Sequence, residues 1–213
     1  MPIKPLIMES RDASLIVIDN PNNPSGRLLL DSRSVKKLCE STTGVVLIDE
    51  SYYEFSRFTV ADLVKKHPNL AVTRTLSKAF GLAGLKLGYM VAGETVLDLL
   101  SPVDLPLRPS KPSIYAAIEA LKDTRYVKRN LRWIAEERER VRKIVDEIGL
   151  NVFPSCTNFL LIRTDVPYAA RRLKELGVTV FDPSKQLPCE FIRVSIGLKE
   201  NNDAFLSALK QIL

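Results

Sequence analysis

The sequence predicts an α/β fold: a mostly parallel sheet with helices on both faces, followed by a small α+β domain. Apolar runs at 14–20, 44–50 and 70–77 are separated by segments of helical pattern. The first two runs, SLIVIDN and GVVLIDE, are continuous rather than alternating, which is typical of strands buried on both faces. Strand–helix–strand order at this spacing favours right-handed crossovers and a parallel sheet.

The helices and the last strand of this first part follow from the same patterns. After the first strand, Val35, Leu38 and Cys39 share one helical face, and Ser32 or Ser34 is available as the N-cap. A shorter helical pattern, TVADLVKKH, follows the second strand. The run LGYMVAG is compatible with a fourth, antiparallel strand at the side of the sheet, because the connection before it is too short for a crossover helix.

Beyond residue 93 the pattern becomes that of a smaller α+β domain. The chain is therefore expected to divide into a large domain, residues 1–124, and a small domain, residues 125–213, entered through a long helix. The Pro-rich stretch 101–112 is expected to be irregular. Helices are predicted at Ser113–Lys122, Thr124–Glu147 (before Gly149), 167–176 and 200–213, and strands at 158–164, 177–182 and 190–197.

Composition excludes several classes of function. The 213 residues are 46% hydrophobic and 26% charged, which is ordinary for a globular protein. The formal net charge is +6, but the basic excess at Tyr126–Lys143 is interleaved with glutamates and indicates a solvated helix face, so no nucleic-acid partner is expected. No stretch approaches the ~20 apolar residues of a membrane span, so no membrane partner is expected either.

The metal-binding and redox-active residue types are sparse. Cys39, Cys156 and Cys189 match neither a zinc pattern nor a disulfide framework, and they favour a reducing cytoplasm. The single histidine, His67, precedes Pro68 and is expected in a surface turn. Neither a metal site nor histidine-based catalysis is therefore predicted.

Polar residues follow the predicted strands at the edge where ligands bind in an open α/β sheet. Asn20, Asp49 and Lys78 are spaced 29 residues apart, each at or just past the end of a strand. A lysine performs covalent chemistry as an amine that condenses with a carbonyl. Pyridoxal 5′-phosphate (PLP) requires such a lysine, a carboxylate at its ring nitrogen and donors around its phosphate. Taken singly, Asp49 is equally well explained as a strand-end cap, and Lys78 is better explained as a surface or ion-paired lysine.

Four stretches carry a resemblance to a known family: NPNNPSG at 20–26, DESYYEF at 49–55, RTLSKAFGLAGLKLGY at 74–89, and the span from TNFLLIR to FIRVSIG at 157–197. In this order they resemble the PLP-dependent aminotransferases of fold type I (class I/II). The histidinol-phosphate aminotransferase branch is the most similar, and threonine-phosphate decarboxylase is a near relative. The resemblance covers essentially the whole chain, and it identifies the predicted sheet as part of the large domain of these enzymes.

The resemblance implies cofactor-site roles for the matching residues. Lys78 would bind PLP covalently and move the substrate proton, and Asp49 would pair with the pyridinium nitrogen. Two further groups of side chains would bind the rest of the cofactor: Asn23 and Tyr52 at the phenolic oxygen, and Thr75, Ser77 and Lys86 at the phosphate.

Arg193 is the candidate substrate-binding residue. In FIRVSI, strand alternation places it opposite Ile192 and Val194, off the apolar face. An exposed strand arginine would explain this placement without the resemblance, which implies that Arg193 binds the substrate's anionic group. The family usually has arginine where this chain has Lys86, and a second arginine at or beside Phe181. Lysine lacks the bidentate fork of arginine, so we expect a less rigidly held phosphate.

The predicted function is a cytoplasmic PLP-dependent aminotransferase that exchanges amino groups between a small, phosphorylated amine or amino acid and a 2-oxo acid. A threonine-phosphate decarboxylase-like enzyme and a non-catalytic remnant or assembly subunit are the alternatives. Chains of this family begin well before the NPNNPSG turn. We therefore expect an N-terminal part of the large domain to be missing, and the edge of the strand at 14–20 to pair with another chain. A homodimer or a companion N-terminal chain is predicted.

Overall fold

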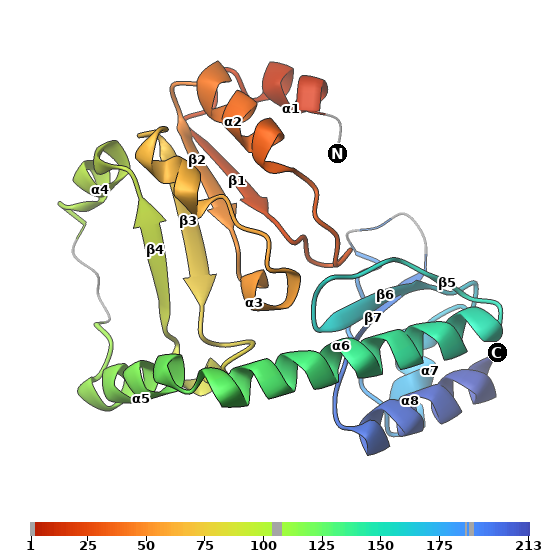
Figure 1. Cartoon of the computed structure of the whole chain (residues 1–213). Coiled ribbons are helices and arrows are strands. Elements are labelled where there is room, and N and C mark those ends of the chain that lie inside the picture. Colours follow the sequence, from red (N-terminus) through yellow and green to blue (C-terminus); the bar gives the residue numbers. More distant parts are fainter. Residues whose placement is uncertain (1–2, 104–107, 186, 188–189) are drawn as a thin grey trace. The chain divides into compact units, whose positions relative to one another are not determined.

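The structure is a computed structural model that describes residues 3–103, 108–185, 187 and 190–213 (Figure 1). The chain forms two compact units, one of Met1–Asn22 with Leu28–Lys128 and one of Asn23–Arg27 with Arg129–Leu213. The division falls inside the long helix α6 (Thr124–Glu147), and the turn at 23–27 belongs to the second unit. The functional domain boundary at 124/125 stays a prediction.

In the first unit, four strands among the described residues form one sheet in chain order: β1 (Leu15–Asp19), β2 (Val45–Asp49), β3 (Leu70–Thr75) and β4 (Gly88–Ala92). The first three are parallel, and β4 runs antiparallel to β3, as the arrows in Figure 1 show. The mostly parallel sheet with an antiparallel fourth strand is therefore confirmed. The carboxyl ends of β1, β2 and β3 meet at one edge.

The core of the first unit lies on one face of this sheet. Ile16, Val46, Ile48 and Val72 pack there against the predicted apolar face of α2 (Ser32–Ser41), with partly buried residues of α1 (Ile3–Glu9) and η1 (Ala61–Lys65). On the other face of β1, Leu15 and Val17 are 55% and 60% exposed, so the described helices do not cover both faces at this strand. The remaining helices of this unit are α3 (Tyr53–Ser56), η2 (Ala83–Leu85), α4 (Glu94–Leu100) and α5 (Lys111–Lys122).

Two local predictions for this unit were wrong. The N-cap of α2 is Asp31, whose Oδ1 accepts from the Ser34 backbone N–H at 2.8 Å, because a carboxylate one residue earlier reaches that donor. His67 is buried, with only 9% of its surface exposed, and does not lie in a surface turn. Its backbone N–H donates to the Leu63 carbonyl and its carbonyl accepts from Leu70, so it closes the turn that leads into β3.

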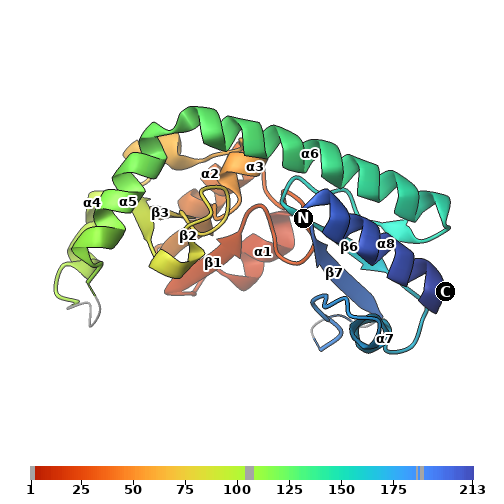
Figure 2. The same cartoon turned by 90° about the horizontal axis from the view of Figure 1, so that it is seen from below.

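The second unit is a three-stranded antiparallel sheet in the order β5 (Asn151–Val152), β6 (Phe159–Arg163) and β7 (Phe191–Ser195). In its core, residues of β6 and β7 pack with buried residues of three helices: α6, α7 (Ala169–Glu175) and α8 (Lys199–Ile212). Figure 2 shows α8 beside the C-terminal part of α6, where Asn202 donates to Glu137 at 2.8 Å. The predicted α+β architecture is confirmed.

The strand predicted at 177–182 does not form. A single bridge remains, in which Phe181 and Arg193 exchange two backbone hydrogen bonds of 3.1 and 2.9 Å. Pro183 has no N–H to extend the ladder beyond that point. Cys189 and part of the Pro-rich segment, residues 104–107, lie outside the described residues. In the part of the chain that the structure describes, no helix is both long and apolar enough to cross a membrane.

Candidate active site

The Asp49 carboxylate is held at the carboxyl end of β2. Its Oδ1 accepts two hydrogen bonds from Ser51, one from the backbone N–H at 2.8 Å and one from the hydroxyl at 2.5 Å. These contacts fix the plane of the half-buried carboxylate, and Oδ2 has no hydrogen-bond partner among the described residues. The carboxylate is thus oriented and has one oxygen available for a ligand. The sequence analysis missed Ser51, although Asp followed two residues later by Ser is a common signal for such a turn.

Lys78 lies three residues past the end of β3, on an exposed turn. Its Nζ is 5.9 Å from the ring centre of Tyr52, which is buried and precedes α3. Since Asp49 and Tyr52 are connected through the same short turn after β2, the sheet edge brings the carboxylate, the phenol and the amine to one region. The carboxyl-end placement predicted for Asp49 and Lys78 is confirmed.

The hydroxyl of Thr75 organises the loop that carries the lysine. Its Oγ1 donates to the Leu87 carbonyl at 3.3 Å and accepts from the Ser77 backbone N–H at 3.1 Å. Lys86 ends η2 with a left-handed backbone conformation (φ 53°) and an exposed side chain. Thr75 thus ends β3, and Ser77 and Lys86 lie in the loop that connects β3 to β4.

The remaining two predicted site residues, Asn23 and Arg193, meet in the second unit. The Arg193 Nη1 donates to the Asn23 Oδ1 at 2.5 Å. The guanidinium carbon lies 4.4 Å from the ring centre of Phe181 and 5.1 Å from that of Phe159. The buried Nε has no hydrogen-bond partner among the described residues. Asn23 and two aromatic rings thus fix the guanidinium. The predicted alternation holds, since Ile192 is 1% exposed on the opposite face.

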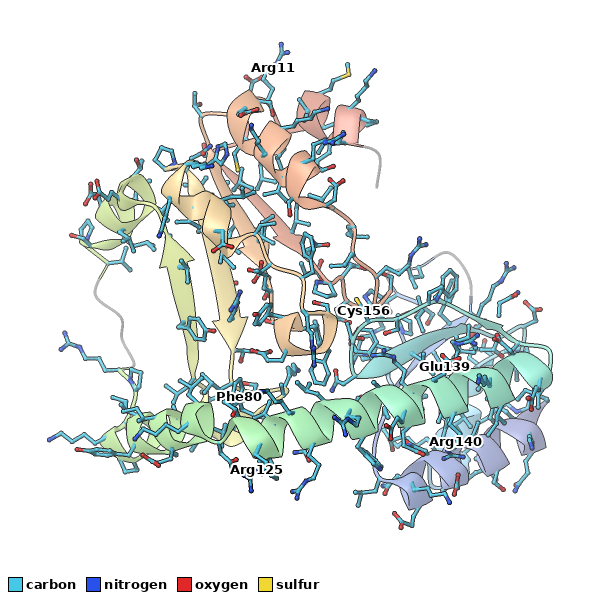
Figure 3. All side chains as sticks on the ribbon, viewed as in Figure 1. Arg11, Phe80, Arg125, Glu139, Arg140 and Cys156 are labelled. Carbon is cyan, nitrogen blue, oxygen red and sulfur yellow. The ribbon has the colours of Figure 1, made fainter. Side chains whose placement is uncertain are left out.

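The NPNNPSG turn is held at both ends by contacts that local sequence does not reveal. At its start, the buried Asn20 Nδ2 donates to the Leu30 carbonyl at 3.0 Å, and Asn20 Oδ1 accepts from the backbone N–H groups of Leu29 and Leu30 at 2.7 and 3.3 Å. At its end, the Gly26 carbonyl accepts from Cys156, labelled in Figure 3, through both the backbone N–H (2.8 Å) and the thiol (3.3 Å). Cys156 is 130 positions away in the chain, so only the folded structure shows this contact.

Glycine is required at position 26 itself. Its φ is +72°, and a Cβ there would lie 2.4 Å from the Ser155 Oγ. Any side chain would therefore displace the segment that carries Cys156, and with it the turn that places Asn23 against Arg193.

Each unit presents side chains that can bind polar groups of a ligand. An amine, an oriented carboxylate, a phenol and hydroxyl groups lie at the sheet edge of the first unit, and a partly covered guanidinium lies in the second. The described residues contain no cluster of three or more histidine, cysteine, aspartate or glutamate side chains that could hold a metal ion.

The chain is similar to known proteins in sequence and in fold. A histidinol-phosphate aminotransferase of Sulfurisphaera tokodaii is 38% identical over 207 residues, which cover 96% of this chain and 57% of that protein. The crystal structure of histidinol-phosphate aminotransferase from Sinorhizobium meliloti in complex with pyridoxal-5′-phosphate is similar in fold, with a TM-score of 0.89 and 26% identity over 99% of this chain and 61% of that one.

A second enzyme activity is represented among the similar folds. The crystal structure of L-threonine-O-3-phosphate decarboxylase from Porphyromonas gingivalis has a TM-score of 0.82 and 25% identity, covering 99% of this chain and 68% of that one. The chain spans a little more than half the length of the relative above. The family model described as aminotransferase class I and II matches residues 3–209. The chain therefore belongs to the class I and II aminotransferase family.

Proposed function

We propose that this chain provides the PLP-binding and C-terminal parts of a PLP-dependent aminotransferase. The observation that carries the proposal is the sheet edge of the first unit, where Lys78 Nζ lies near the Tyr52 ring and Ser51 orients the Asp49 carboxylate. Membership of the family and the PLP complex of the Sinorhizobium meliloti enzyme support it.

The residues present fit PLP in their chemistry. Asp49 keeps one carboxylate oxygen for a protonated ring nitrogen, because Ser51 occupies only Oδ1. Tyr52 and Asn23 carry a hydroxyl and an amide, groups that can hydrogen-bond a phenolic oxygen, and the Asn23 Oδ1 accepts from Arg193. The loop of Thr75, Ser77 and Lys86 offers two hydroxyls and a cation to a phosphate.

In the proposed mechanism each residue binds or moves a proton. PLP, when bound, supplies the electron sink that makes the substrate's Cα–H bond acidic. Lys78 would hold the cofactor aldehyde through its amine and would carry the proton from the substrate Cα. The Asp49 carboxylate would pair with the ring nitrogen, and the two hydrogen bonds from Ser51 would keep that carboxylate oriented.

We propose a small, phosphorylated amine or amino acid as amino donor and a 2-oxo acid as acceptor. Arg193 would bind the anionic group of each substrate, since Asn23 and the Phe181 ring fix its guanidinium and leave the buried Nε–H unpaired among the described residues. Sequence similarity to the histidinol-phosphate aminotransferase of Sulfurisphaera tokodaii supports a substrate of that kind. We further propose a second copy of the chain or a companion chain as its partner.

The test is a titration of the purified chain with PLP, followed by its visible absorption. Borohydride reduction and peptide mass spectrometry should then find the cofactor mass on Lys78. The Lys78→Ala variant should lose both signals. Lys36→Ala is the matched control, because Lys36 is an exposed lysine on α2 that pairs with Glu40 at 3.8 Å. Equal labelling of many lysines, with no preference for Lys78, would refute the proposal.

Two alternatives give different outcomes with the same protein. Release of carbon dioxide from a phosphorylated amino acid would indicate a decarboxylase, which the fold similarity to the Porphyromonas gingivalis enzyme allows. PLP binding without transfer of an amino group to the cofactor from any amine tested would indicate a non-catalytic subunit.

A further inference from the structure

A buried ion pair lies directly behind the candidate site. Glu50, which follows Asp49, is fully buried (0% exposed) and accepts two hydrogen bonds at Oε2 from Arg74, from Nε at 3.0 Å and from Nη2 at 2.8 Å. Arg74 precedes Thr75 on β3. Successive residues of an extended chain point to opposite faces of the sheet. The Glu50–Arg74 pair therefore lies on the face opposite to Asp49 and Thr75.

Both members of the pair make further hydrogen bonds and contacts with their surroundings. Glu50 also accepts from the Thr59 hydroxyl at 2.8 Å and, at Oε1, from the Val60 backbone N–H at 2.7 Å. The Arg74 Nη2 donates in addition to Thr59 Oγ1 at 2.7 Å, and its guanidinium carbon stacks 3.5 Å from the ring centre of Tyr53. One network thus joins the end of β2, the start of α3, the Thr59–Val60 turn and β3.

We propose that the Glu50–Arg74 pair positions the cofactor site, an inference that rests on the proposed function. Each charged or aromatic member of the network is the chain neighbour of a site residue: Glu50 of Asp49, and Arg74 of Thr75. Tyr53, under the guanidinium, likewise follows Tyr52. Hydrogen bonds to both carboxylate oxygens of Glu50 and from Nε and Nη2 of Arg74 restrict the geometry of the network, and with it that of the adjacent backbone.

Stability alone does not account for such a pair. A buried ion pair can often be replaced by uncharged groups of similar volume with little loss of stability, because the desolvation of both charges offsets their attraction. Position is more demanding, since a displacement of about 1 Å at a reacting group can cost roughly 100-fold in rate. The two roles can therefore be separated by a variant that keeps the volume and removes both charges.

The variant is Glu50→Gln combined with Arg74→Met. Glutamine keeps an acceptor for the Val60 N–H, and its amide nitrogen can donate to Thr59 Oγ1 in place of Arg74. The Thr59 hydroxyl loses its acceptor and the second amide N–H gains none, so the urea midpoint is expected to fall by about 0.5–1 M while the chain still folds. The dissociation constant for PLP, measured by absorption titration, is expected to rise about 10–100-fold, as for other residues that orient ligand-binding groups.

A second readout does not involve the cofactor. Hydrogen exchange of the protein without PLP should be faster in the variant over residues 49–52 and 74–77, and unchanged in β1. The matched control is Glu139→Gln with Arg142→Met, an exposed pair on α6 with a 2.8 Å contact between Arg142 Nη2 and Glu139 Oε1 (Glu139 is labelled in Figure 3). This control should change neither exchange nor affinity.

The outcomes decide the proposal in each case. Wild-type exchange over both segments, or wild-type PLP affinity in a variant that exchanges faster, would overturn it. If the double variant does not fold, Arg74→Lys serves instead, because it keeps the charge but loses the fork. It should fold and still weaken PLP binding, and unchanged affinity would overturn the proposal. Failure of the wild type to bind PLP would refute the proposed function, while the exchange data would still show whether the pair orders the two segments.

Discussion

Replacing Asn20 by alanine should destabilise the chain more than its single amide would suggest. Asn20 is 0% exposed and serves three backbone groups of the returning chain: the Leu30 carbonyl, the Leu30 N–H and the Leu29 N–H. Alanine cannot form any of these bonds. Leu30 is 3% exposed, so its carbonyl and its N–H would remain buried without the bonds that Asn20 provides.

The magnitude follows from those two buried groups. A buried donor or acceptor without a partner costs about 1–3 kcal/mol, so Asn20→Ala should lower the free energy of unfolding by about 2–6 kcal/mol. This is a large part of the ~5–15 kcal/mol that stabilises a typical domain. With a urea dependence of about 2 kcal/mol/M, the midpoint should fall by about 1–3 M.

The assay is urea unfolding followed by far-ultraviolet circular dichroism, with Asn22→Ala as the control. Asn22 lies in the same turn and donates one partly buried bond to Asp19 Oδ1 at 2.8 Å, so its loss should cost about 1 kcal/mol or less. Equal midpoints for the two variants would refute the reasoning, because they would show that the buried contacts of Asn20 carry no more free energy than one near the surface.

Three further outcomes are expected. Burial raises the pKa of Glu54, whose Oε2 has no hydrogen-bond partner among the described residues. A carboxyl group with a raised pKa destabilises the folded state once the pH rises above that pKa. Glu54→Gln should therefore raise the urea midpoint at pH 7 and not near pH 4. An equal gain at both pH values would contradict the role of the Glu54 charge. Gly88→Ala should lower the free energy of unfolding by about 1–3 kcal/mol, since a Cβ would lie 2.7 Å from the Arg74 carbonyl oxygen. Gly84→Ala should not, because a Cβ there would have nothing within 4 Å. Equal melting temperatures of the two variants would contradict the predicted clash. Burial raises the pKa of the Cys39 thiol to about 11. At pH 8 a disulfide reagent should therefore modify Cys39 about 100-fold more slowly in the native chain than in the urea-unfolded chain. Similar rates in the two states would show that the thiol is accessible in the native chain.

The elements of the fold could be predicted where one segment alone carries the signal. The apolar runs gave β1, β2 and β3 to within a residue or two at each end, and the stripe of α6 gave that helix from Thr124 to Glu147. The prediction of a strand at 177–182 was wrong because strand formation requires pairing with a neighbouring strand, and this segment pairs with β7 only at Phe181. The prediction for His67 was wrong because its burial depends on contacts with other parts of the chain.

For the site, the sequence by itself determined which residue types stand at the strand ends, because strand direction and spacing place Asp49 and Lys78 at one edge of a parallel sheet. Only the tertiary structure decided how they are held. The contacts of Asn23 with Arg193, of Gly26 with Cys156 and of Glu50 with Arg74 join positions 170, 130 and 24 residues apart. Hydrogen bonds depend on distances of a few tenths of an ångström, which no local pattern encodes, and they are fixed only when the packed core brings those segments together.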